Sequence, residues 1–163
     1  MKRAVILISL LLLLTSFILR TKTTQTISII KIPQTIALVH DGQLYFIRVK
    51  LNNKRANLLI DTGAAASLLD INQADNYDFT FNKTEQTFTG VGGLTDRYIV
   101  RHCKFDHDST SLPVYPFGAD LKHVVESFNQ KGITIVGILG SDFLRKNDAI
   151  IDYKRKQLIL NNP

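Results

Sequence analysis

The segment LLIDTGAAAS, residues 58–67, constrains the fold of this chain more than any other part of its sequence. A short apolar run, which predicts a buried strand, ends directly on the acid Asp61. A carboxylate at the end of a buried strand costs free energy unless its charge is shared or hydrogen-bonded. Thr62 supplies a hydroxyl for hydrogen bonding, and Gly63 lets the backbone turn sharply after the acid. Taken alone, the segment is explained equally well by an ordinary Asp-Gly turn.

A second segment of the same kind, GILGSDFL, covers residues 137–144 and follows the apolar run 133–136. An apolar strand again ends at glycines. We expect a short helix to follow it through Arg145, with Ser141 or Asp142 as its N-cap residue.

Between these two segments lies the glycine-rich sequence FTGVGG, residues 88–93. It is flanked by residues 84–87 and 98–100, which predict two strands. The pattern indicates a β-hairpin with a tip that can bend, although an ordinary hairpin turn would use the same glycines.

An acid turn, a glycine-rich hairpin and an apolar strand ending in glycine, in this order, resemble the retropepsin-like aspartic proteases. The similarity is greatest to the small, single-lobe bacterial members, here of a membrane-anchored type, and covers about residues 35–161. It implies an all-β fold: a single-lobe, closed β-barrel with a flap hairpin and one or two short helices. In this chain an apolar N-terminal helix would precede the barrel.

The resemblance also implies roles for individual residues. Asp61 would be the catalytic acid, and the active-site loop would continue through Thr62, Gly63 and Ala64. The flap that covers the substrate would be formed by Gly90, Val91, Gly92 and Gly93. Structural support beneath the loop would come from Leu139, Gly140 and Asp142, where Asp142 either caps the helix or pairs with Arg145.

The chemistry that this family uses needs two carboxylates that share one proton. One acts as a base on water while the other, protonated, polarises the scissile carbonyl. The chain contains a single Asp-Thr-Gly sequence, so the resemblance implies a twofold homodimer in which Asp61 of each copy meets at the axis. Thr62 would hydrogen-bond across the dimer. Because Ala64 lacks the hydroxyl found in many two-lobed relatives, we expect activity at weakly acidic to neutral pH.

The charge of the chain argues against a nucleic-acid partner. The formal net charge is +6, but five of the basic residues precede the first acidic residue, Asp41. From Asp41 onward there are 15 basic and 14 acidic residues, so the domain is close to neutral. A nucleic-acid surface needs clustered positive charge. The one basic triplet, residues 154–156, lies between two predicted strands and is interpreted as a solvated turn.

The N-terminus predicts contact with a membrane through residues 4–19, an uncharged stretch dominated by Leu and Ile between basic flanks. We expect residues 1–22 to be a signal anchor or a signal peptide, residues 23–34 a linker, and residues 35–163 the protease domain. No small-residue cleavage site is evident, which favours an uncleaved, single-pass anchor with the domain on the extracytoplasmic side. Cleavage would instead leave the domain secreted or periplasmic.

No cofactor or metal is expected. Cys103 is the only cysteine, and the spacing of its neighbours His102, Asp106, His107 and Asp108 matches no common zinc pattern. Further strands are predicted at residues 35–39, 44–50, 67–70, 98–105, 112–114, 149–153 and 157–160, a loop or helical turn at 72–75, and a helix at 123–129.

Three functions remain open from the sequence. An anchored, dimeric aspartic endopeptidase acting on peptides or proteins is the first, and a catalytically silent module of the same fold that binds peptides or only dimerises is the second. The third is an unrelated β-barrel that binds lipids or other ligands, in which Asp61 is merely a turn residue.

Overall fold

The computed structural model describes residues 32–90 and 93–163, and the structural statements that follow concern this part of the chain. The predicted anchor or signal, its apolar helix, most of the linker, and the flap residues Val91 and Gly92 lie outside the described residues. In the described ranges, no helix has both the length and the apolar character needed to cross a membrane.

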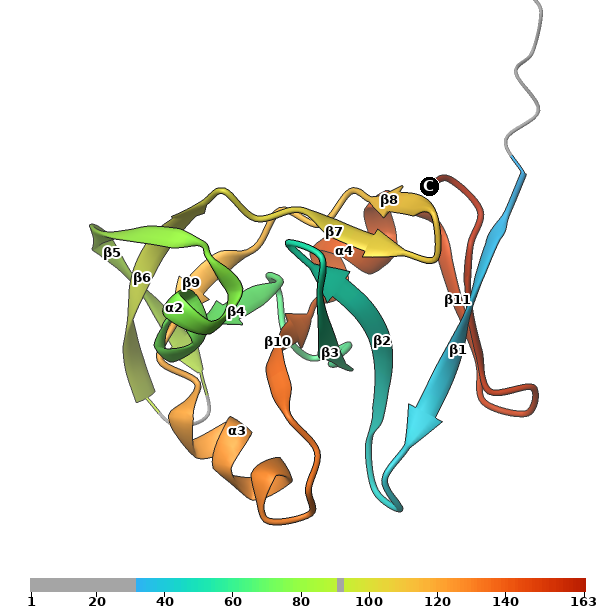
Figure 1. Cartoon of the computed structure of the whole chain (residues 1–163), viewed down its shortest axis with the longest axis horizontal. Helices are drawn as coiled ribbons and strands as arrows, with labels where there is room; N and C mark the ends of the chain where they lie inside the picture. Colours follow the sequence, from blue (N-terminus) through green and yellow to red (C-terminus); the bar gives the residue numbers. More distant parts are fainter. Residues whose placement is uncertain (1–31, 91–92) are drawn as a thin grey trace, which may run out of the picture. The chain divides into compact units, whose positions relative to one another are not determined.

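The described chain is mostly β-structure with a few short helices (Figure 1). The strands are β1 (Gln34–His40), β2 (Tyr45–Leu51), β3 (Lys54–Ile60), β4 (Leu68–Asp70), β5 (Thr80–Gly90), β6 (Gly93–Arg101), β7 (Phe105–His107), β8 (Thr110–Leu112), β9 (Phe117–Ala119), β10 (Ile135–Leu139), β11 (Ala149–Asp152) and β12 (Gln157–Leu160). The helices are the 3-10 helix η1 (Ile71–Gln73) and the α-helices α2 (Ala74–Tyr77), α3 (Lys122–Asn129) and α4 (Ser141–Lys146).

The predicted closed barrel is wrong. The strands follow the open path β11-β12-β1-β2-β3-β10-β4-β9-β6-β5, with the β7–β8 hairpin attached to β2. The physical reason lies partly in β1, whose residues 34–37 pair with β12 whereas residues 38–40 pair with β2. The sheet therefore divides along β1, and within the described chain it ends in edge strands at β11 and at the flap strand β5.

The centre of the fold is formed by β3 and β10, which run parallel, and by β4, which pairs antiparallel with the other side of β10. All five residues of β10 are buried, as expected for a central strand covered on both faces. A Cβ atom on Gly137 would lie 2.3 Å from the Leu68 carbonyl oxygen. Only glycine allows β4 to approach β10 this closely.

Two apolar clusters hold these strands in place. The larger contains the fully buried Ile36, Leu58, Leu139, Leu158 and Leu160, which join the two ends of the domain to its central strands. The smaller lies under α3, where Val125 and Phe128, three residues apart on one helical face, pack with Phe46, Leu59, Ile135 and Ile138.

Most predicted elements are present, with bounds that shift by one to several residues. The predicted strand 98–105 is interrupted: β6 ends at Arg101 and β7 begins at Phe105. His102 adopts a left-handed backbone conformation (φ 59°), and its carbonyl accepts a 2.7 Å hydrogen bond from the Asn52 side chain. No local pattern indicated this bond, because its two residues lie 50 positions apart in the sequence. The three-residue strand β9 was not predicted.

Candidate active site

The acid-turn segment lies at the end of β3, where the strand leaves the buried sheet. The Asp61 N–H donates to the Leu139 carbonyl at 3.1 Å, extending the parallel pairing of β3 with β10 by one residue. Asp61 itself is half-buried, whereas Thr62 and Gly63 are exposed. The carboxylate therefore stands at the boundary between the core and solvent.

The turn after the acid is fixed by hydrogen bonds to the acid itself. The Gly63 N–H donates to Asp61 Oδ1 at 2.8 Å, and the Ala64 N–H donates to the Asp61 carbonyl at 3.2 Å. A Cβ atom on residue 63 would lie 3.2 Å from the same Oδ1 atom, a tight contact. Gly63 thus brings its N–H to the carboxylate without crowding it, and Oδ2 of Asp61 receives no hydrogen bond from the described residues.

The second predicted segment supports this loop from below. The Ser141 N–H donates to the Ala64 carbonyl at 2.8 Å. A Cβ atom on Gly140 would lie 2.6 Å from the carbonyl carbon and oxygen of Ala66, so the two backbones are in direct contact. The structure therefore brings Leu139 and Gly140 against the loop that carries the acid.

Asp142 neither caps α4 nor pairs with Arg145, the two contacts predicted for it. Gly140, not Ser141 or Asp142, occupies the N-cap position of α4, and no described cation pairs with Asp142. Instead, Asp142 Oδ1 accepts a 2.7 Å hydrogen bond from Ser67 Oγ, which itself accepts the Gly140 N–H at 3.0 Å. Ser67 is fully buried. This chain of hydrogen bonds links the end of the active-site loop to the start of α4.

Sequence reasoning missed Ser67 as part of the site. Its only sequence signal is a hydroxyl residue between small and apolar residues, six positions after the acid, and serine is common in many other settings. The partner that gives it meaning lies 75 residues away.

The flap hairpin is formed by β5 and β6 and ends on the pair Gly90 and Gly93. Gly93 has φ 102°, a conformation that L side chains rarely adopt, which explains glycine there. Whether the flap covers a substrate stays a prediction, because its central residues Val91 and Gly92 lie outside the described residues.

The base of the flap is joined to the active-site loop through β9. The Phe117 N–H donates to the Ser67 carbonyl at 3.0 Å, while Ile99 of the flap pairs with Phe117. The guanidinium of Arg97 lies 3.8 Å from the centre of the Phe117 ring and also stacks on Phe88. Loop and flap are thus anchored to neighbouring strands.

A hollow of about 600 Å³ opens beside Thr62. We call it the Thr62 hollow; it is lined by Thr62, Ser141, Leu144, Arg145, Asp148, Ala149, Ile151 and Tyr153. Neither Arg145 nor Asp148 has an ion-pair partner within residues 32–90 and 93–163. The adjoining edge strand β11 and its turn expose Ile150 and Tyr153. This surface therefore carries one unpaired cation, one unpaired anion and exposed apolar groups.

The described part of the chain gathers no three potential metal ligands of the His, Cys, Asp or Glu type in one place. Burial raises the pKa of the Cys103 thiol, so the thiolate that metals bind is disfavoured there. That the protein uses no metal stays a prediction.

Comparisons with known proteins agree with this geometry at the level of the fold. The family model of the retroviral aspartyl proteases matches residues 44–152, a range that includes the acid turn, the flap and the strand end before α4. No curated protein matches the chain.

Solved structures of similar fold include the retroviral protease-like domain of Ddi1 from Leishmania major, with 16% identity, a TM-score of 0.50, and coverage of 74% of this chain and 90% of that domain. A retropepsin-like aspartic protease from Rickettsia conorii has 19% identity, a TM-score of 0.47, and coverage of 78% and 89%. EIAV protease, solved with the inhibitor HBY-793, has 21% identity, a TM-score of 0.48, and coverage of 66% and 90%. The match of the family model over most of the domain shows that this chain belongs to the retroviral aspartyl protease family.

Proposed function

We propose that this chain is an aspartic endopeptidase that hydrolyses peptide bonds as a homodimer. The observation that supports this most directly is the setting of Asp61. It is a half-buried carboxylate at the end of a buried strand, oriented by the Gly63 N–H at 2.8 Å. Such an acid is held in one orientation and remains accessible, as a catalytic group must be.

The hydrogen bond from Gly63 assigns different roles to the two oxygens of Asp61. Oδ1 is occupied by the N–H, so Oδ2 is left to face the partner copy's acid or the attacking water. Two carboxylates in contact hold one proton between them because both cannot ionise at that distance. The ionised acid takes a proton from water as the water oxygen adds to the peptide carbonyl carbon, and the protonated acid donates its proton to the carbonyl oxygen. In the second step the C–N bond breaks: the first acid gives its proton to the leaving nitrogen, and the second acid takes one back from a hydroxyl of the tetrahedral intermediate.

The homodimer is proposed because one chain supplies one such acid. The Thr62 hollow supports this: it adjoins the active-site loop and carries Arg145 and Asp148, neither of which has an ion-pair partner in the described chain. A surface that meets its own copy across a twofold axis must be complementary to itself, and one cation beside one anion satisfies that condition. The Thr62 hydroxyl makes no hydrogen bond inside the described protomer and is free to bond across the axis.

The test is cleavage of a mixed peptide library by the full chain in detergent, between about pH 4 and 8, read by mass spectrometry. Wild type should cut peptides, pepstatin should inhibit, and Asp61→Asn should abolish cleavage while the dimer persists in sedimentation. Asp75→Asn is the matched control, since it makes the same chemical change at an exposed position in α2. It should cut like wild type.

A folded dimer that cuts nothing would refute the endopeptidase and leave the alternative, a catalytically silent peptide-binding or dimerisation module. Cleavage that persists in Asp61→Asn would refute the role of the acid. A rate that peaks below about pH 3.5, where an unperturbed Asp titrates, would contradict the expected weakly acidic to neutral range. Family membership already removes the unrelated ligand-binding β-barrel.

We also propose that residues 4–19 anchor the protein in a membrane as a single-pass segment, with the domain on the extracytoplasmic side. The support comes from sequence: an uncharged stretch rich in Leu and Ile, flanked by basic residues. Leu12→Arg should release the chain from membranes washed at alkaline pH, because a central charge opposes insertion. A mature chain that begins after residue 22 would show signal cleavage instead.

A further inference from the structure

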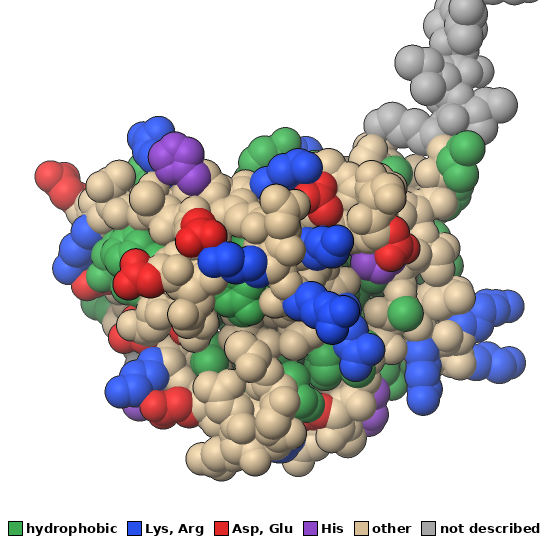
Figure 2. Space-filling model, viewed as in Figure 1, with side chains coloured by type: hydrophobic (Ala, Val, Ile, Leu, Met, Phe, Trp, Pro, Cys, Tyr) green, Lys and Arg blue, Asp and Glu red, His purple; other side chains and the backbone are tan. Residues whose placement is uncertain are grey.

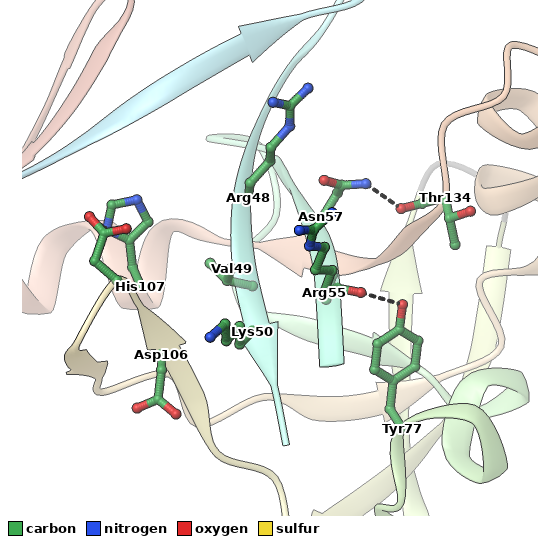
Figure 3. A pocket seen from close by; sticks show the side chains of 11 residues that line it. Arg48, Val49, Lys50, Arg55, Asn57, Tyr77, Asp106, His107 and Thr134 are labelled. Carbon is green, nitrogen blue, oxygen red and sulfur yellow. Dashed lines mark hydrogen bonds and ion pairs between the residues drawn. The ribbon is translucent and has the colours of Figure 1, made fainter. Parts of the chain in front are cut away.

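A second site lies on β2 and β3, at the ends of these strands distant from Asp61. It is a hollow of about 660 Å³ lined by residues of β2, β3 and β7, by Tyr77 of α2, and by Thr134. We call it the basic hollow, after three cations in its lining: Arg48, Lys50 and Arg55. Figure 3 shows Arg48 and Lys50 on β2 beside Arg55 on β3.

The strand register places like charges next to each other in this hollow. Lys50 lies directly opposite Arg55 in the antiparallel β2–β3 ladder, and Arg48 lies opposite Asn57. Directly opposite residues share one face of the sheet with Cβ atoms about 5 Å apart, and like charges in that position destabilise the pair. The three cations therefore repel one another along a single face of two strands.

One carboxylate stands next to this group, because Asp106 lies directly opposite Lys50 in the antiparallel β2–β7 ladder, but it forms no ion pair with any of the three cations. None of Arg48, Lys50 and Arg55 has an ion-pair partner in residues 32–90 or 93–163.

Two acids line the hollow, and each contacts a side chain other than the three cations. Asp106 lies 3.1 Å from Lys104 Nζ, and Asp108 lies 3.5 Å from His107 Nδ1. Figure 2 shows Lys and Arg side chains gathered near the middle of this face, over β2 and β3. The two acids offset the three cations only in part, so with a neutral His107 the lining keeps a net positive charge that an anionic ligand can neutralise.

The walls of the hollow are more rigid than its cations. Asn57 Nδ2 donates to the Thr134 carbonyl at 2.7 Å, and the buried Tyr77 hydroxyl donates to the Arg55 carbonyl at 2.9 Å (Figure 3). These bonds fix the backbone that carries Arg55 and the edge of the hollow next to β10. The three long side chains therefore extend from a fixed frame.

We propose that the basic hollow binds a phosphate group, either of a soluble phosphate ester or of a lipid headgroup. A phosphate brings up to two negative charges and several acceptor oxygens, which matches three cations better than a single carboxylate does. The guanidinium groups of Arg48 and Arg55 present paired N–H donors suited to phosphate oxygens, and Lys50 adds a point charge. The proposal does not depend on peptide cleavage.

The first experiment measures thermal unfolding and calorimetric binding of the full chain with inorganic phosphate and inorganic pyrophosphate, at constant ionic strength set with chloride. Wild type should be stabilised in a saturable manner. Arg55→Gln and Lys50→Gln should each weaken the apparent affinity about tenfold, the loss expected for one charge-assisted bond.

Lys154→Gln is the matched control, because it removes one positive charge from the exposed turn between β11 and β12. It should bind like wild type. Without any phosphate, Arg55→Gln should unfold at the same temperature as wild type or higher, because the cross-strand repulsion is gone.

A second experiment identifies the source of the phosphate. Full chains are mixed with vesicles of phosphatidylcholine, with or without phosphatidic acid. The binding of wild type to the vesicles is compared with that of Arg55→Gln. A difference that appears only on phosphatidic acid vesicles assigns the hollow to a lipid headgroup, and a difference only with the soluble anions assigns it to a soluble ester.

Three results would overturn the proposal. The first is no saturable effect of either soluble anion together with no difference on vesicles. The second is an equal loss in Lys154→Gln, which would mean that total charge and not the hollow attracts the anion. The third is a lower unfolding temperature of Arg55→Gln without phosphate, which would give Arg55 a purely structural role.

Discussion

Replacing Ser67 with Ala tests whether the active-site loop is held by the hydrogen bonds described above. Ser67 Oγ accepts the buried Gly140 N–H at 3.0 Å and donates to Asp142 Oδ1 at 2.7 Å. The first bond is between neutral groups and contributes about 1 kcal/mol; the second goes to a charged acceptor and contributes about 1.5–3 kcal/mol. The substitution also leaves the Gly140 N–H buried without a partner.

We therefore expect Ser67→Ala to lower the free energy of unfolding by about 2–4 kcal/mol. Urea unfolding followed by circular dichroism would measure this as a lower midpoint with an unchanged slope. Ser127→Ala is the control, because the Ser127 hydroxyl donates to the Val124 carbonyl on the exposed side of α3. This substitution should change the free energy of unfolding by no more than about 0.5 kcal/mol.

Asp142→Asn and the double variant complete a double-mutant cycle. The coupling between Ser67 and Asp142 should be about 1 kcal/mol or more, because the two side chains are in direct contact. A loss below about 0.5 kcal/mol in Ser67→Ala, or additive effects in the cycle, would refute the reasoning, since the loop would then be held by its backbone contacts alone.

Three other predictions follow from the structure. Gly137→Ala should lower the free energy of unfolding by about 3 kcal/mol or more, since its Cβ would meet the Leu68 carbonyl oxygen at 2.3 Å. Gly118→Ala, whose nearest contact is the Ile71 methyl at 2.9 Å, should lower it clearly less in the same urea assay. Arg145→Glu and Asp148→Arg should each weaken the proposed dimer at least about tenfold in sedimentation, and a mixture of the two variants should associate again; dimers of unchanged strength would place the interface elsewhere. Hydrogen bonds from the Leu44 N–H, the Lys131 ammonium and the Gln43 N–H hold the pKa of Asp41 well below its usual value of 3.8. A carboxyl group whose pKa is lowered by folding contributes its full stabilisation at pH values above its pKa in the unfolded chain. This stabilisation is lost as the pH falls toward the pKa of the group in the folded protein. Asp41→Asn should therefore show a shallower loss of stability than wild type between about pH 4 and 2, and parallel curves would contradict the assignment.

The sequence predicted the parts of this fold that depend on local pattern. An apolar run that ends in Asp-Thr-Gly, and a second that ends in Leu139 and Gly140, predicted two strands, and the family resemblance implied that the second lies beneath the loop of the first. The hairpin β11–β12 was equally clear, because two apolar runs flank a basic turn.

The features that were missed depend on contacts distant in sequence. The strand β9 has only three residues, too few for alternation to be visible, and it exists because β4 and β6 pair with it on either side. The role of Asp142 could not be foreseen because its partner, Ser67, is 75 residues away. The closed barrel was expected from the family resemblance alone, and no local pattern in β1 indicated that this strand would exchange partners along its length.

The pairing of β1 with β12 has a consequence for the order in which the domain can form. Gln34 is the register partner of Leu160, so the first described strand is completed by the last one. Ile36, Leu158 and Leu160, all fully buried, come together only when both ends of the domain are present. During synthesis, the core between β1 and β12 must therefore wait until residues 157–160 have left the ribosome. A chain that stops before Gln157 would expose this apolar surface and be a target for proteolysis.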